Sequence, residues 1–170
     1  MSRWVNRLLS KVYTRVPALS ERYGRRAGSF DDVPLPDLSV LRRPVHDARI
    51  AVVTAGGVHR AGQPPFAMQN PEGDGSWRSI PQDAPRQELV ITHDYYDHTA
   101  ADQDVNCVFP VDRLAELATA GMIGEPAPRH AGMMGHLSGA QLARLVDHSA
   151  GEIVSQFADD AVDLVLAVPG

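Results

Sequence analysis

Six polar residues follow or flank three short apolar runs of this 170-residue sequence, and four of them are histidines. They are Thr54 and His59 after the first run, His93 and Asp94 after the second, and His130 and His136 around the third. In an α/β sheet, ligands bind at the carboxyl ends of the strands. The pattern therefore predicts a small-molecule pocket, although strand ends carry polar residues in any soluble protein.

A glycine turn, Ala55-Gly56-Gly57, ends the first apolar run. Gly56 and Gly57 would let backbone N–H groups approach a phosphate or carboxylate; a tight exit from a strand explains them equally well. The turn lacks G-x-G-x-x-G spacing and precedes a proline-rich stretch instead of a helix. A dinucleotide site is therefore not expected.

The stretch DQDVNCVFPVDRL holds Asn106, which can fix a turn, and Cys107, the single cysteine of the chain. A nearby helix N-terminus could stabilise the Cys107 thiolate, but the apolar neighbours favour burial and a raised pKa. We therefore expect a structural cysteine. One cysteine permits no intrachain disulfide, which suits a reducing compartment.

Metal and hydrolase chemistry find no support in the motifs. The segment HDYYDH, residues 93–98, offers carboxylates and imidazoles, but H-E-x-x-H and paired-cysteine spacings are missing from the sequence. A G-x-S-x-G elbow is missing as well. We predict no metal and no cofactor in this chain.

Strands and helices alternate in the body of the chain. Apolar runs predict strands at Arg49–Thr54, at Glu88–Thr92, more weakly within 125–136, and at Asp163–Val168. Helices are expected within 110–124 and 138–160, the latter capped by Ser138 and either continuous or broken at Gly151. Prolines and glycines in 63–81 exclude regular structure there. The pattern predicts an α/β fold with a three-layer, mainly parallel (Rossmann-like or flavodoxin-like) sheet.

A basic amphipathic helix is expected within residues 1–27, followed by an extended connector over 28–48 and the α/β domain over 49–170. Residues 1–26 hold seven of the 16 cations and one of the 21 acids, so the remainder carries a net charge of −11. This acidic body argues against nucleic acid as a partner. The helix either packs on its own domain or on another subunit, or contacts an acidic partner or anionic membrane through residues 3–16. No signal peptide or membrane span is visible, so we expect a cytoplasmic protein.

Four blocks carry a family resemblance: ARIAVVTAGGVHRAG, SIPQDAPRQELVITHDYYD, DQDVNCVFPVDRLAELATAGMIGEPAPRHAGMMG and AVDLVLAVPG. In this order and spacing they resemble the selenoprotein subunits of D-proline reductase and of the glycine/sarcosine/betaine reductase B component. In that family a strand like Asp163–Val168 leads into a motif of selenocysteine, two residues and cysteine. The chain ends one residue before such a motif, so we expect a UGA codon and a longer protein. Truncation of this kind would leave Leu164, Leu166 and Val168 exposed.

The resemblance implies a reductase that cleaves a C–N bond with a selenol and draws electrons from a dithiol or thioredoxin-type donor. It works on a small molecule, beside a protein partner or a second copy. By the same resemblance, the pocket around the selenol takes in Gly56, Gly57, His93, Asn106 and Cys107. Thr54, at the end of the first apolar run, is a further candidate for substrate binding. His59 and His130 are its expected proton-transfer groups. The alternative is a non-catalytic binding or scaffold module that docks through the N-terminal helix.

Overall fold

The computed structural model describes residues 3–24 and 39–170. Most of the predicted connector therefore lies outside the described residues. Its described part, from residue 39, contains one turn of 3₁₀-helix at Val45–Asp47 before the first strand.

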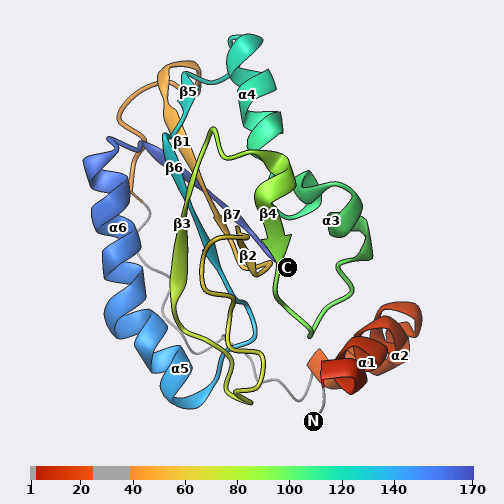
Figure 1. Ribbon diagram of the computed structural model, residues 1–170. Helices are drawn as coiled ribbons and strands as arrows, with labels where there is room; N and C mark the ends of the chain where they lie inside the picture. The colour runs from red at the N-terminus through yellow and green to blue at the C-terminus, as the bar shows by residue number, and fades with distance from the viewer. Residues whose placement is uncertain (1–2, 25–38) are drawn as a thin grey trace.

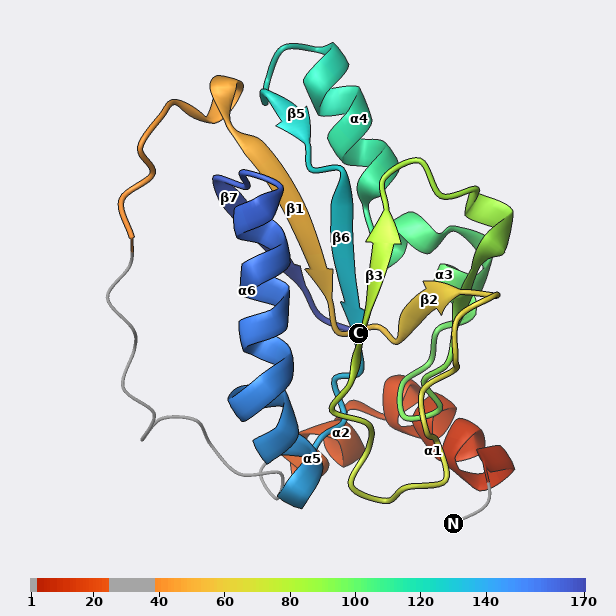
Figure 2. The same ribbon diagram turned by 60° about the vertical axis from the view of Figure 1, so that its left-hand side comes forward.

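The central strand of the main sheet is β1 (Arg49–Thr54). It pairs in parallel with β5 (Glu125–Pro126) and β6 (Arg129–Met133) along one side and with β7 (Leu164–Val168) along the other. An antiparallel strand, β3 (Trp77–Pro81), adds to β6. Figures 1 and 2 show this twisted sheet with helices on both of its faces. The expected α/β fold with a mainly parallel sheet is confirmed.

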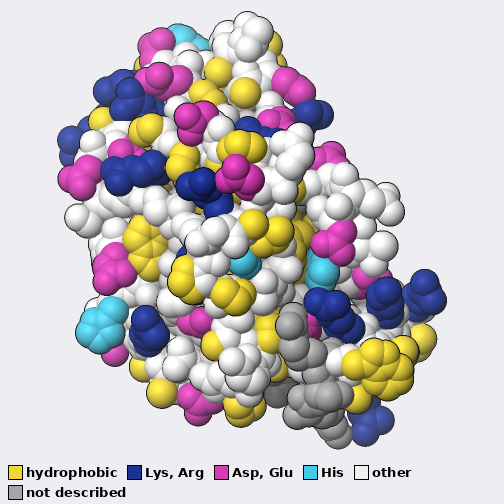
Figure 3. Space-filling view, viewed as in Figure 1, with side chains coloured by type: hydrophobic (Ala, Val, Ile, Leu, Met, Phe, Trp, Pro, Cys, Tyr) yellow, Lys and Arg dark blue, Asp and Glu magenta, His cyan; other side chains and the backbone are white. Residues whose placement is uncertain are grey.

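The N-terminal segment forms two helices, α1 (Arg3–Arg15) and α2 (Pro17–Gly24). The expected helix is confirmed, and Pro17 opens the second one because proline suits the first turn of a helix. Both helices lie at the carboxyl ends of the parallel strands (Figure 1). Figure 3 shows Lys and Arg side chains gathered over this corner beside exposed hydrophobic ones.

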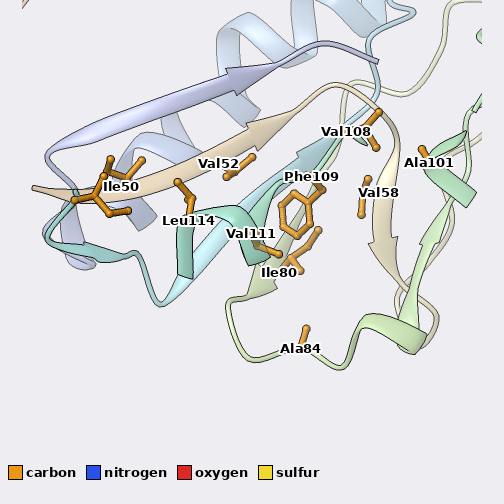
Figure 4. Packing of buried hydrophobic residues seen from close by; sticks show 11 residues of the cluster. Ile50, Val52, Val58, Ile80, Ala84, Ala101, Val108, Phe109, Val111 and Leu114 are labelled. Carbon is orange, nitrogen blue, oxygen red and sulfur yellow. The ribbon is translucent and has the colours of Figure 1, made fainter. Parts of the chain in front are cut away.

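The two faces of β1 pack on different helices. Ile50 and Val52 belong to the larger hydrophobic cluster, with Leu114 of α4 (Val111–Thr119) (Figure 4). Ala51 faces the other way, onto α6 (Ala150–Asp159). Successive side chains of a strand alternate between faces, so a run that is apolar at every position requires cover on both.

The second long helical segment is continuous. α5 (Gly139–Arg144) runs through a π-helical turn at Leu145–Ser149 into α6, so the break considered at Gly151 does not occur. Ser138 occupies the N-cap position, but its side chain makes no capping hydrogen bond. The backbone N–H of Ala140 donates instead to the Glu72 carboxylate, at 3.1 Å.

The strand expected at Glu88–Thr92 forms, but outside the main sheet. It is β4 (Leu89–Ile91), which pairs antiparallel with β2 (Val58–Arg60) in a two-stranded sheet. The short helix α3 (Thr99–Gln103) follows it, and 3₁₀ turns at Arg86–Glu88 and Val105–Cys107 precede β4 and α4.

The expectation that residues 63–81 exclude regular structure is wrong at their end, where β3 forms. Ile80 is fully buried in the large cluster and draws this segment onto β6. Among residues 3–24 and 39–170, β3 pairs with one strand only and lies at the edge of the sheet, where the missing N–H of Pro81 costs little.

Leu164 and Leu166 of β7 are 39% and 40% exposed, whereas Val168, also expected to be exposed, is half-buried against the larger hydrophobic cluster. Within the described residues, β1 is the one strand that pairs with β7. None of the helices in the described ranges is long and apolar enough to cross a membrane.

Candidate functional site

A cavity of about 760 Å³ opens at the carboxyl ends of the parallel strands. Ala55 follows β1, Gly135 and His136 follow β6, and Pro169 and Gly170 follow β7, and all of them line it. This is the edge at which α/β sheets bind their ligands. The sequence predicted a pocket at this edge of the sheet, but several of the side chains that line it differ from the predicted ones.

Aromatic rings form one wall of the cavity. His93, Tyr95 and Tyr96 reach it from the loop after β4, and His136 reaches it from the loop after β6. The rings of Tyr95 and His136 stack with centroids 3.9 Å apart, and His93 meets Tyr96 edge-on at 4.9 Å. Interlocked rings of this kind make a rigid, largely apolar surface.

His93 is the most buried imidazole of this wall, with 5% of its surface exposed. Its Nδ1 accepts a hydrogen bond from the backbone N–H of Tyr95, at 3.3 Å, which places the ring proton on Nε2. Burial, with smaller contributions from His136 and His98, lowers the pKa of His93 to about 4. His93 is therefore a neutral ring at physiological pH.

The opposite wall comes from the N-terminal helix. Asn6, Leu9, Ser10 and Tyr13 of α1 line the cavity. The Nε of Arg7 donates to the buried Asp94 carboxylate at 2.7 Å and joins α1 to the loop that carries His93. A segment more than eighty residues away in sequence thus completes the cavity.

The backbone N–H groups of the glycine turn all donate hydrogen bonds within the protein. The backbone N–H of Ala55 donates to Val168, that of Gly56 to the Thr54 hydroxyl and that of Gly57 to Met133. The three bonds measure 2.9, 3.0 and 2.9 Å. Since all three donors are used, the turn acts as a strand exit, and the geometry does not support an anion-binding role for it.

Neither His59 nor His130 lines the cavity. His59 bonds through Nδ1 to the Arg60 carbonyl and through Nε2 to the Thr92 hydroxyl, both at 2.8 Å. His130, fully buried, accepts from the Val52 backbone N–H at 3.0 Å and bonds through Nε2 to Gln82 at 2.6 Å. Both nitrogens of each ring are thus used within the fold, and the geometry gives no support to proton transfer by either.

Comparison with known proteins identifies the family of this chain. A family model described as glycine/sarcosine/betaine reductase selenoprotein B matches residues 28–169. The chain belongs to this family. It is also 34% identical, over 137 residues, to the D-proline reductase subunit gamma of Acetoanaerobium sticklandii.

That alignment covers 81% of this chain and 54% of the relative, so the chain spans about half the length of the subunit it matches. No solved structure matched the chain. The family match begins at residue 28, so helix α1, which completes the cavity, lies outside the matched range.

The block around Asn106 does not meet the cavity in this member of the selenoprotein B family. The Asn106 amide donates to Asp104 and Asp112, at 2.9 and 2.8 Å, and its carbonyl accepts from the Asp112 backbone N–H at 3.1 Å. These bonds fix the start of α4. Asp104, Asn106 and Asp112 line a separate depression of about 590 Å³.

The expectation that Cys107 is buried is wrong, because its side chain is exposed. The 3₁₀ turn Val105–Cys107 directs the following Val108 and Phe109 into the core and turns Cys107 outward. Within the described part of the chain, no three His, Cys, Asp or Glu side chains come together as metal ligands.

Of the six polar residues singled out at the strand ends, His93 and His136 line the cavity, and of the residues assigned a role by the family resemblance, His93 does. Sequence reasoning missed Tyr95 and Tyr96, although their position beside His93 in the HDYYDH segment is a usable signal. It also missed the inner face of α1, since no local pattern shows where a helix docks.

Proposed function

We propose that this chain forms the substrate-binding part of a selenol- or thiol-dependent reductase subunit of the glycine, betaine or D-proline reductase type. Under this proposal a selenocysteine motif follows Gly170, and the subunit cleaves a C–N bond of a small amine reductively. The selenol would supply a nucleophile that is ionised at neutral pH, and a dithiol donor would regenerate it.

The observation that carries the proposal is the course of the chain after β7. Pro169 and Gly170 line the same cavity as His93. A Cβ on Gly170 would lie 2.8 Å from the Cα of Gly56 and 3.0 Å from the carbonyl oxygen of Ala55. A reactive residue directly after Gly170 would therefore lie next to residues that line the cavity.

The walls suit such chemistry in two ways. The Nε2–H of neutral His93 can donate a hydrogen bond to a substrate carboxylate or to a developing charge without bringing a charge of its own. Tyr95 and His136 offer stacked apolar faces that exclude water from the reacting atoms.

Tyr96 remains a phenol in this environment. Its hydroxyl donates to the Gly56 carbonyl at 2.9 Å, and burial raises its pKa above the usual value. No Asp, Glu, Lys or Arg side chain within the described ranges lines the cavity. A substrate of zero net charge, such as a zwitterionic amino acid, is therefore the best fit.

The subunit would work with a protein partner, as the name of its relative implies, in a reducing compartment such as the cytoplasm. The test is expression of the complete gene in a selenocysteine-competent host, with and without selenium, followed by intact mass and selenium analysis.

With selenium, the proposal expects a longer protein with one selenium atom per chain, and dithiol-dependent cleavage of one of the amines named in the family. Without selenium, a product ending at Gly170 serves as the matched control. If the product ends there in both cultures, the non-catalytic binding or scaffold alternative replaces the reductase.

A further inference from the structure

Helix α1 presents two polar residues, Asn6 and Ser10, on its inner face, beside Leu9 and Tyr13. Asn6 and Ser10 are both 94% buried, whereas Trp4 on the opposite side is 72% exposed. Ordinary amphipathic packing would bury the tryptophan and expose the amide. The inner face of α1 is therefore partly polar, and it faces the cavity instead of a hydrophobic core.

The Ser10 hydroxyl is satisfied within the helix, where it donates to the Arg7 carbonyl at 2.9 Å. The Asn6 amide has no hydrogen-bond partner among the residues that the structure describes, and it lines the cavity. Its N and O atoms are not among the fully enclosed side-chain atoms without a partner, so water or a ligand in the cavity can reach them. Asn6 is therefore placed to bind the polar group of a molecule in the cavity.

Electrostatics hold the helix in this position. Arg7 reaches the Asp94 carboxylate, which is 1% exposed. In the same loop, hydrogen bonds from Thr99 are the main cause of the lowered pKa of Asp97, and Lys11 and Arg15 add smaller contributions. The cations of the basic segment thus act on the acidic body of their own chain. The Arg7 contact joins α1 directly to the loop that carries His93, so Arg7 is the residue to change in order to test the position of α1.

We propose that helix α1 is a wall of the small-molecule site that decides the size of molecule admitted to the cavity, with Arg7 as its positioning residue and Asn6 facing the bound molecule. The proposal concerns the cavity of the function above but does not depend on the redox chemistry. The two can fail separately.

The test measures how fast reagents of different size react with a single cysteine thiol inside the cavity. In the Cys107→Ser background, Ala55→Cys places the thiol in the cavity. Its reaction is followed with two uncharged reagents, methyl methanethiosulfonate and the bulkier benzyl methanethiosulfonate. Arg7→Ala should raise the rate with the bulky reagent about tenfold, and the rate with the small one much less.

Arg7→Lys should restore slow labelling, because it keeps the charge opposite Asp94. Arg113→Ala is the matched control, since it removes an exposed arginine from a surface pair with Glu116. Equal rates for Arg7→Ala and Arg113→Ala, with both variants folded by circular dichroism, would overturn the proposal.

A second pair of variants tests the same wall without touching Arg7. In the Cys107→Ser background, Trp4→Cys and Asn6→Cys place a thiol on opposite sides of α1. A docked helix predicts labelling at least tenfold faster at position 4, given the exposures of 72% and 6%. Indistinguishable rates would mean that α1 does not close the cavity in solution.

Discussion

His93 and His130 are held neutral by their surroundings. Burial is the main cause in each case, and it lowers the pKa of both side chains to about 4, with Arg86 adding to the effect at His130. An unfolded chain would titrate them near 6.5. A histidine whose pKa is depressed on folding contributes stability above the unfolded pKa and loses it as pH falls toward the folded pKa.

We therefore expect the free energy of unfolding to fall between pH 6.5 and pH 4, by on the order of 1 kcal/mol per pH unit for each of the two histidines. Asp74 and Asp112 do not account for this window, because hydrogen bonds and nearby arginines lower their pKa values and move their titration below it. Urea denaturation at half-unit pH intervals measures the slope.

His130→Asn should flatten this slope, and it should also lower stability at pH 7.5 by about 1–3 kcal/mol, because the Val52 and Gln82 partners lose their bonds. The exposed His46→Asn variant is the control and should change neither quantity. An unchanged slope in His130→Asn would show that this ring is not the titrating group.

At the scale of elements, the turn from β1 into β2 sets the position of His93. Gly57 adopts a φ of +73°, and a Cβ there would lie 2.7 Å from the Cβ of His93 and 2.8 Å from the Thr92 carbonyl oxygen. Its own carbonyl accepts from the Thr92 backbone N–H at 3.0 Å. Glycine thus brings the small sheet close to the main one.

Gly57→Ala should destabilise the protein by about 2 kcal/mol or more, from the left-handed backbone and the close contacts together. Gly62→Ala is the matched control: a Cβ at Gly62 meets no atom within 4 Å, and its φ is not positive. Thermal melts of the two variants beside the parent protein measure the difference. Equal melting temperatures would contradict the packing described at Gly57.

At the scale of the whole molecule, β7 combines an apolar sequence with an outer edge that is unpaired within the described residues. Val165 is 45% exposed, on the strand face opposite Leu164 and Leu166. An exposed, hydrophobic edge strand is a template for pairing with another chain. The 170-residue protein should therefore self-associate through β7 as its concentration rises.

Val165→Lys should reduce this association, measured by light scattering against concentration, and change the free energy of unfolding by only about 0.5 kcal/mol. Val154→Lys, on the exposed side of α6, introduces the same side chain away from the edge strand and should leave association unchanged. An equal effect of the two variants would show that net charge, not the edge, controls association.

The sequence by itself determined the fold class, the order of most elements and the family. Runs such as Ile50–Val53 are apolar at consecutive positions, which requires a sheet covered on both faces, and this signal is local. The family blocks are equally local. Sequence reasoning also located the edge of the sheet at which the cavity opens, because that edge follows from parallel strand order.

Tertiary structure alone decided which side chains face the cavity. His59 and His130 carry the right chemistry, but each is consumed by partners distant in sequence, such as Thr92 and Gln82. Ile80 likewise draws a proline- and glycine-rich segment into the sheet. Asn6 lines the cavity on a helix that Arg7 joins to a buried carboxylate 87 residues away. Such contacts depend on packing between distant segments, for which a single sequence holds no periodic signal.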